Sequence, residues 1–172
     1  YGARSPMVRA EENLPFPYND IQASLVIACN SERNQWAYLA FSSDPNPADR
    51  EIATDSYSNV PIAVRWDTER EDYRLCQDHG SQYLAFKRRD IDEVIDYSKT
   101  ADTLLFQINI YSAGETLFRI PLSGSDAVIT QAQSKCGVSS SQSPAAATDS
   151  RSEATTKAWR EAEEQARREA EE

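Results

Sequence analysis

The chain has 172 residues, enough for one domain of ordinary size plus terminal segments, because single domains commonly contain about 100 to 150 residues. Its formal net charge is −10, and side chains of both signs are spread along it rather than clustered, which argues against a nucleic-acid-binding surface. No stretch approaches the roughly 20 consecutive apolar residues that a membrane span needs.

The first 20 residues contain Pro6, Pro15 and Pro17 and show no apolar periodicity, so we expect residues 1–20 to be an extended leader outside the folded domain. The opening Tyr1-Gly2-Ala3-Arg4 has neither an initiator methionine nor an apolar signal core, and we expect a mature or trimmed product. The folded domain is predicted to cover residues 21–137.

The first half of that domain predicts strands joined by polar turns. Apolar alternation predicts a strand at residues 24–29, a return strand at 36–41, and a third strand at 60–66. Proline, acidic, serine and asparagine residues predict a surface loop at 42–59.

A second hairpin is predicted next. A charged turn at 68–72 leads into strands at 73–77 and 82–86, which are joined by the tight turn Asp78-His79-Gly80. Asp90 then predicts the N-cap of a short helix, in which the apolar residues follow at helical spacing: Ile91, Val94 and Ile95.

The strongest pattern is a hairpin of two apolar strands at residues 103–111 and 116–122. One face of it carries the following apolar residues: Leu104, Phe106, Ile108, Ile110, Phe118, Ile120 and Leu122. A closing helix is predicted to start at Ser123 or Ser125, either of which can cap the freed amides, and to end at Gly137. Its predicted inner stripe is Val128, Ile129, Ala132 and Cys136.

The last residues differ in composition from the domain. Residues 138–152 are rich in Ser, Gln, Pro and Ala and predict a flexible linker. Residues 153–172 are almost entirely Ala, Glu, Arg and Gln and predict a solvated charged helix, with a coiled-coil face for a partner as the alternative. Trp159 is the one residue there that would anchor a partner.

Together these patterns predict a mainly β fold: a small antiparallel β-sandwich of about seven strands with one short helix and one closing helix, plus the C-terminal charged helix. The alternative is an α+β fold with a single sheet and two helices on one face.

The three cysteines, Cys29, Cys76 and Cys136, have no zinc-ligand spacing, even with His79 close to Cys76, so we expect no metal and no cofactor. Cys29 and Cys136 end the first predicted strand and the last predicted helix. A bridge between them would close a loop of roughly one hundred residues and contribute about 4 kcal/mol in the chain-entropy model. The alternative is three reduced thiols in a cytosolic protein.

Catalytic signals are sparse. The only histidine, His79, lies in a predicted turn, and a thiol-dependent site would have to use Cys76 with His79. The acidic loop at 44–55 lacks the spacing of a calcium loop and is interpreted as a solvated loop. Arg65 and Asp67, two apart on one strand face, predict at most a surface ion pair.

Four features occur in a familiar order: Ser24-Leu25-Val26-Ile27-Ala28-Cys29, Val64-Arg65-Trp66-Asp67, a short helix at 90–97, and Phe118-Arg119-Ile120-Pro121-Leu122-Ser123-Gly124 followed by a helix to Cys136. Over about residues 21–137 the chain resembles the VasI/TagO family of type VI secretion-associated proteins, and its last part is similar to invasion-associated locus B proteins. The resemblance implies an exported, periplasmic or secreted β-sandwich with paired cysteines at the positions of Cys29 and Cys136, which acts as an accessory or interaction protein without known enzymatic activity.

Three functions follow as hypotheses. The first is a non-catalytic exported domain that binds a protein partner through the acidic loop or the tail. The second is a periplasmic hydrolase inhibitor that presents a loop, with Asp78 and His79 as candidate contact residues beside Trp159. The third is a thiol-dependent enzyme that uses Cys76.

Overall fold

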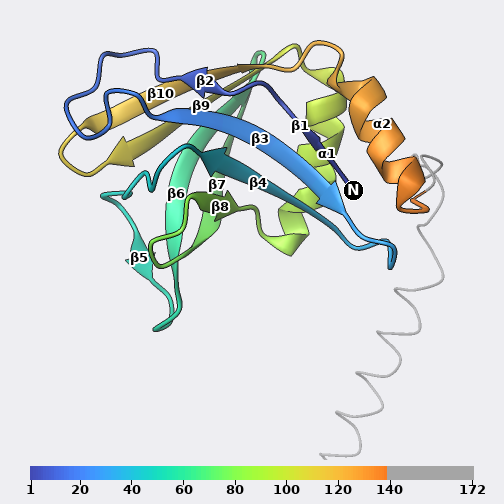
Figure 1. Cartoon of the computed structure of the whole chain (residues 1–172), viewed down its shortest axis with the longest axis horizontal. Helices are drawn as coiled ribbons and strands as arrows, with labels where there is room; N and C mark the ends of the chain where they lie inside the picture. Colours follow the sequence, from blue (N-terminus) through green and yellow to red (C-terminus); the bar gives the residue numbers. More distant parts are fainter. Residues whose placement is uncertain (139–172) are drawn as a thin grey trace, which may run out of the picture. The chain divides into compact units, whose positions relative to one another are not determined.

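The computed structural model describes residues 1–138 of the chain; the predicted linker and charged helix, with Trp159, lie outside the described residues apart from Val138. The described residues form ten strands and two α-helices (Figure 1). In chain order they are β1 (Gly2–Arg4), β2 (Val8–Arg9), β3 (Gln22–Cys29), β4 (Gln35–Phe41), β5 (Glu51–Ile52), β6 (Tyr57–Trp66), β7 (Glu69–Asp78), β8 (Tyr83–Ala85), α1 (Ile91–Thr100), β9 (Thr103–Ile110), β10 (Gly114–Pro121) and α2 (Ser125–Lys135). A short 3-10 turn at Arg88–Asp90 precedes α1.

The strands pair antiparallel in the order β1-β3-β4-β8-β7-β6-β9-β10, with β2 beside β3 and β5 beside β6. The sheet curls so strongly that its two halves face one another: the ring of Phe41 on β4 lies 5.7 Å from that of Phe118 on β10 and 6.1 Å from that of Phe106 on β9. The predicted mainly β, antiparallel fold with a short and a closing helix is confirmed. Hydrogen bonding runs through one continuous sheet, and its facing halves enclose the core as the layers of a sandwich do.

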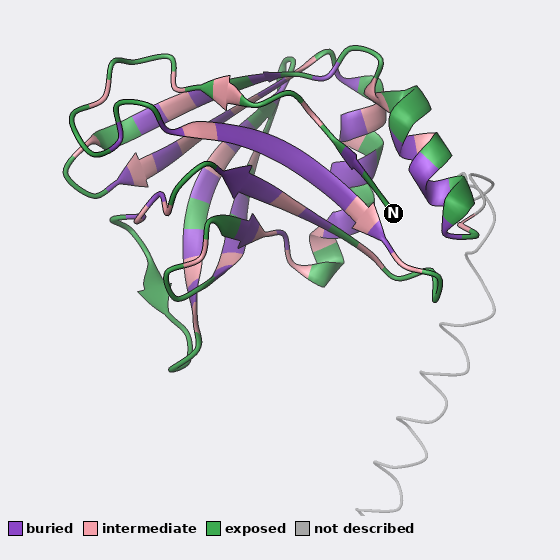
Figure 2. Cartoon of the chain, in the orientation of Figure 1, coloured by how far each residue is buried: buried purple, intermediate pink, exposed green. Residues whose placement is uncertain are grey.

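The core is built on the central hairpin, as the alternation predicts. All seven apolar side chains expected on its inner face are buried. Burying a side chain of this size contributes about 1.5 to 3 kcal/mol relative to leaving it exposed, so β9 and β10 anchor the domain. Figure 2 shows β3 on the opposite half of the sheet buried along most of its length.

The short helix α1 packs against β4 and against side chains of β6 and β7. Ile91, Val94 and Ile95 are buried, as their spacing predicts, and the ring of Tyr97 stacks on that of Trp66 at 5.4 Å. Nearby, the hydroxyl of Tyr73 donates to a carboxylate oxygen of Glu93 at 3.3 Å, and burial is the main cause that raises the pKa of Tyr73 above its ordinary value.

The closing helix differs from its prediction in two respects. Its N-cap is Gly124, at φ +82°, and neither Ser123 nor Ser125 caps it; the Ser125 hydroxyl donates instead to the carbonyl of Ser98 on α1. Ile129, Ala132 and Cys136 are buried as expected, but Val128 is 49% exposed because it lies about 100° around the helix from Ile129. Gly137 ends the helix at φ +71°, as predicted.

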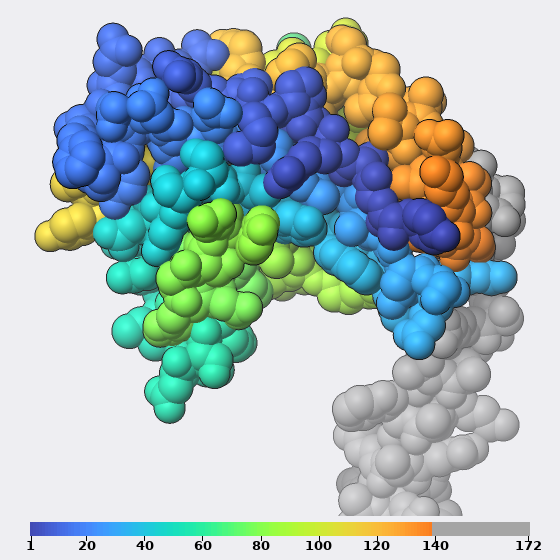
Figure 3. All heavy atoms as spheres, in the orientation of Figure 1, coloured from blue at the N-terminus to red at the C-terminus, as the bar shows by residue number. Residues whose placement is uncertain are grey.

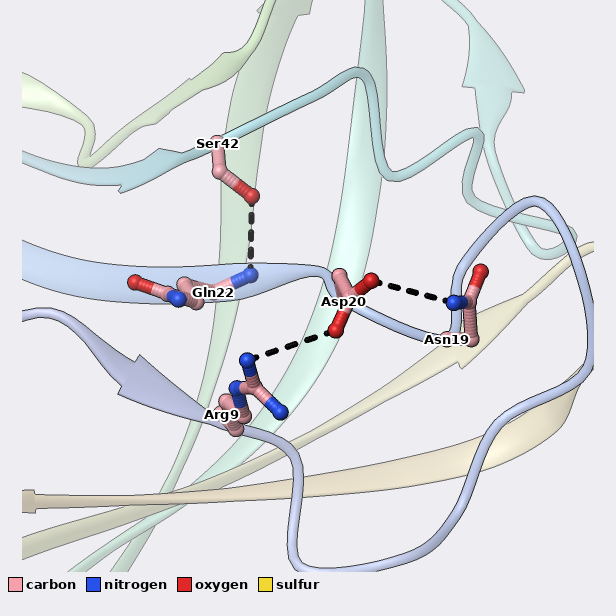
Figure 4. A network of polar contacts seen from close by, with 5 residues as sticks. All are labelled: Arg9, Asn19, Asp20, Gln22 and Ser42. Carbon is pink, nitrogen blue, oxygen red and sulfur yellow. Dashed lines mark hydrogen bonds and ion pairs between the residues drawn. The ribbon is translucent and has the colours of Figure 1, made fainter.

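Residues 1–20 are not a separate leader. Strands β1 and β2 both pair with β3, and Ala3 and Tyr18 are buried in the core. Around the entry to β3, Arg9 pairs with Asp20 at 3.3 Å and the amide of Gln22 donates to the hydroxyl of Ser42 (Figure 4). These strands are too short to show a period, and their partners on β3 lie 13 to 26 residues away in the chain, so local pattern does not reveal them.

Smaller differences concern loops. The predicted loop 42–59 contains β5 and the first residues of β6, and the predicted turn 68–72 narrows to two residues because β7 begins at Glu69. Asp67 and Arg65 form no ion pair within residues 1–138. The Asp67 carboxylate accepts from the main-chain N–H groups of Asp102 and Thr103, at 3.1 and 2.9 Å, and thereby joins the end of β6 to the start of β9.

Candidate functional site

A disulfide joins the two ends of the fold. Cys29 at the end of β3 is bonded to Cys136, the C-cap of α2, with the Cα atoms 6.0 Å apart and a sequence separation of 107. Cys76 is free and half-buried. The pairing expected from the sequence pattern and from the resemblance is therefore present, and it fastens the C-terminal end of α2 to the sheet.

A buried glutamine secures α2 beside this bond. The amide nitrogen of Gln133 donates to the side-chain oxygen of Gln35 at 2.6 Å, and its amide oxygen accepts from the ammonium of Lys99 on α1 at 2.7 Å. With the bond from Ser125 to Ser98 at the other end, α2 is held against both α1 and the sheet. The helix is thus a fixed wall, and its position defines the groove described next.

The curled sheet does not close completely between β3 and β10. At one end of this seam β2 fills the gap, because Ala10 bridges Phe118 and the amide of Glu11 donates to the carbonyl of Leu117 at 2.8 Å. At the other end β1 pairs with β3 but faces α2 across the gap rather than a strand. In Figure 3 the first residues of the chain, in dark blue, lie beside the orange atoms of α2.

A cavity of about 150 Å³, which we call the seam groove, occupies this gap. One wall is residues 3–6, and the other is the segment 121–125 with Val128. Its apolar lining includes Ala3, Leu25, Ile27, Leu122, Val128 and Ile129. Val128, which was expected on the buried face of α2 but is half exposed, therefore lines this groove.

The edge of β1 that borders the groove carries free main-chain groups. Tyr1 and Ser5 bond to β3, since the amide of Cys29 donates to the carbonyl of Tyr1 at 2.8 Å and the amide of Ser5 to that of Leu25 at 2.9 Å. In an antiparallel pair, successive residues of a strand direct their main-chain N–H and C=O groups to opposite edges of the strand. The N–H and C=O groups of Gly2 and Arg4 therefore point away from β3. Within residues 1–138 these groups have no main-chain partner. Such an edge can accept another strand.

Two positive features lie at one end of the groove. The guanidinium of Arg4 is exposed and forms no ion pair among the described residues. The first turn of α2 has no side-chain cap, and a Cβ built on Gly124 would meet open space. The acidic side chain of this turn, Asp126, is exposed, and one of its oxygens accepts from the hydroxyl of Thr130 at 3.3 Å.

A second surface stands out by its lack of charge. The outer faces of β3, β4 and β8 carry no charged side chain: Ser24, Val26 and Ala40 are buried there, and the exposed or half-buried residues are Gln22, Ala28, Trp36, Tyr38, Tyr83 and Ala85. Trp36 and Tyr83 are 39% and 50% exposed, and the rings of Tyr38 and Tyr83 meet edge to face at 5.4 Å. We call this surface the aromatic face.

The sequence-predicted contact turn is present. Asp78, His79 and Gly80 are exposed where β7 ends and the turn to β8 begins, and the amide of His79 donates to the carbonyl of Ser56 at 3.3 Å. Cys76 points to the outer face of β7 beside Asn59, and no hydrogen bond joins it to His79 among the described residues. The structure thus does not bring Cys76 and His79 together as a hydrogen-bonded pair.

The acidic loop uses several of its carboxylates within the fold. Asp44 accepts from Gln77, Asp49 from Asn109, and Glu51 pairs with Arg74. Within residues 1–138 no three His, Cys, Asp or Glu side chains gather as metal ligands would. These contacts give the loop a structural role that its composition does not indicate.

Sequence reasoning missed the seam groove, because its walls are about 120 residues apart in the chain and one of them was assigned to a leader. The single local signal was Val128, an apolar residue at the margin of the helical stripe. Neither α1 nor α2 has the length and apolar character to cross a bilayer. Comparisons with protein-family models, with curated proteins and with solved structures found no significant match to this chain.

Proposed function

We propose that this chain is a non-catalytic accessory domain that binds another protein by holding an extended segment of it in the seam groove. The observation that carries the proposal is the combination of an apolar groove with the free main-chain edge of β1 along one wall. Peptides that add to a sheet edge gain main-chain hydrogen bonds, while pockets beside the edge select their side chains.

The compartment of this function is an oxidising one, the periplasm or the outside of the cell. The disulfide between Cys29 and Cys136 supports this, because disulfides are rare in reducing compartments. The resemblance to VasI/TagO proteins, which are exported accessory proteins, led to the same expectation and adds a role in type VI secretion to the proposal.

The test is peptide binding to the full chain. A synthetic array of linear peptides, each made with a free and with an amidated carboxyl end, is probed with the wild type and with Val128→Glu, which places a charge on the groove wall. Gln131→Glu is the matched control, because it makes the same charge change on an exposed position of the same helix. We expect peptides that bind the wild type and the control alike and bind Val128→Glu about tenfold more weakly.

Binding that is equal in all three proteins would place the contact elsewhere and contradict the proposal. So would an array in which no peptide of either form binds. Thermal melting of the variants checks that Val128→Glu is folded, as the 49% exposure of Val128 predicts.

A further inference from the structure

We infer that the seam groove receives the C-terminal end of its partner: the last residues pair with β1, the final side chain enters the apolar cavity, and the terminal carboxylate meets Arg4 and the first turn of α2. This inference rests on the proposed function and specifies the class of partner. It follows from the direction of β1, the size of the cavity and the charge at its end.

The two walls of the groove run in opposite directions. The ammonium of Lys135, in the last turn of α2, lies 5.9 Å from the ring centre of Tyr1, whereas Ser5 and Pro6 line the cavity together with Ser125 in the first turn. Strand β1 therefore runs from the C-terminal toward the N-terminal end of α2. A peptide that ends at the first turn of α2 lies parallel to β1, with the free groups of Gly2 and Arg4 beside its main chain.

The cavity fits one aliphatic side chain. At about 150 Å³ it is comparable to an engineered apolar cavity that holds benzene. Its floor, which includes Leu25, Ile27 and Leu122, is apolar and buried. A Val, Leu or Ile at the last position of the partner would be covered there, whereas a charged side chain would lose its hydration without gaining a partner.

The charge at this end of the groove selects an anion. The chain carries a net charge of −10 and therefore repels anions in general, yet Arg4, whose guanidinium forms no ion pair among residues 1–138, and the uncapped first turn of α2 both line this cavity. Neither of the two acidic side chains nearby lines the cavity; Asp126 accepts from the hydroxyl of Thr130, and Asp102 accepts from the hydroxyl of Ser123 at 3.1 Å. A carboxylate is the anion that ends every peptide, and a fatty acid would leave the edge of β1 unpaired.

The test is fluorescence anisotropy with the full chain and labelled hexapeptides. One set ends in Val, Leu or Ile with a free carboxylate, a second has the same sequences with an amidated end, and a third ends in Asp or Lys. We expect the first set to bind about tenfold or more tightly than the other two. Arg4→Gln should weaken the first set by a similar factor and leave the amidated set unchanged, while Gln131→Glu should change neither.

Equal binding of free and amidated ends, both weakened by Val128→Glu, would overturn this inference and leave the proposed function standing. Binding that no groove variant weakens would overturn both. Free-carboxyl peptides that bind Arg4→Gln as tightly as the wild type would also overturn the inference, because the guanidinium would then have no part in recognition.

Discussion

Removing the disulfide should destabilise the domain by several kcal/mol. The bond between Cys29 and Cys136 closes a loop of 107 residues. In the chain-entropy model a loop of this length lowers the entropy of the unfolded chain by about 16 cal/mol/K, which corresponds to about 4.8 kcal/mol at 25 °C. Domains of this size are commonly stable by only about 5 to 15 kcal/mol, so the bond accounts for a large share of the stability.

The perturbation is the double variant Cys29→Ala with Cys136→Ala, compared with Cys76→Ala, which removes the free thiol and keeps the bond. Guanidinium unfolding of both proteins, followed by tryptophan fluorescence, gives the difference in free energy. We expect a loss of about 4 to 5 kcal/mol for the double variant and a fall in Tm on the order of 15 °C. Non-reducing mass spectrometry of the wild type should find Cys29 linked to Cys136 and one free thiol on Cys76.

The reasoning would be refuted if the double variant and Cys76→Ala unfolded at the same guanidinium concentration. A linked peptide containing Cys76 would refute the pairing itself. It would also remove the support that the pairing gives to the resemblance, which places the paired cysteines at the two ends of the domain.

Three further predictions concern single side chains. Gln133→Ala should destabilise the domain by about 1 to 3 kcal/mol in chemical unfolding, because it leaves the ammonium of Lys99 without its partner near the interior; an unchanged midpoint would show that water replaces the amide. Phe118→Ala should cost about 3 to 5 kcal/mol, since this fully buried ring contacts both halves of the sheet, and a loss below about 1 kcal/mol would contradict the packing. Tyr73 has a raised pKa in the folded state, so its contribution to the free energy of unfolding is complete below the ordinary tyrosine pKa of about 10 and declines as the pH rises above it. The free energy of unfolding, measured from about pH 8 to 11, should therefore fall less steeply in Tyr73→Phe than in the wild type. Parallel curves for the two proteins would show that the pKa of Tyr73 is not raised by folding.

Strong local patterns predicted much of the fold. Alternation in β9 and β10 identified the buried face correctly, and helical spacing from Ile91 to Ile95 located α1. These signals suffice because a strand or helix with one buried face repeats its apolar residues with a fixed period. The ends of elements were less well predicted, since β7 continues through the charged residues from Glu69 to Asp72, whose strand conformation comes from pairing with β6.

The candidate site was largely hidden from the sequence. Strand β1 has three residues, too few for a period, and it is a strand only because β3 lies beside it. The groove is lined by Ala3, Leu25 and Val128, which lie far apart in the chain, so no local sequence pattern predicts that they meet. The cysteine pair is the exception, because two half-cystines at the ends of predicted elements mark a contact between segments 107 positions apart.

The central claim, that the edge of β1 binds an extended peptide, is tested most directly by amide hydrogen exchange at single residues. The N–H of Arg4 has no partner among the described residues, so it should exchange rapidly in the free protein. With a saturating peptide from the array, the account predicts strong protection at Arg4 and little change on the aromatic face around Tyr38 and Tyr83. Protection confined to the aromatic face, with Arg4 still exchanging rapidly, would contradict the account.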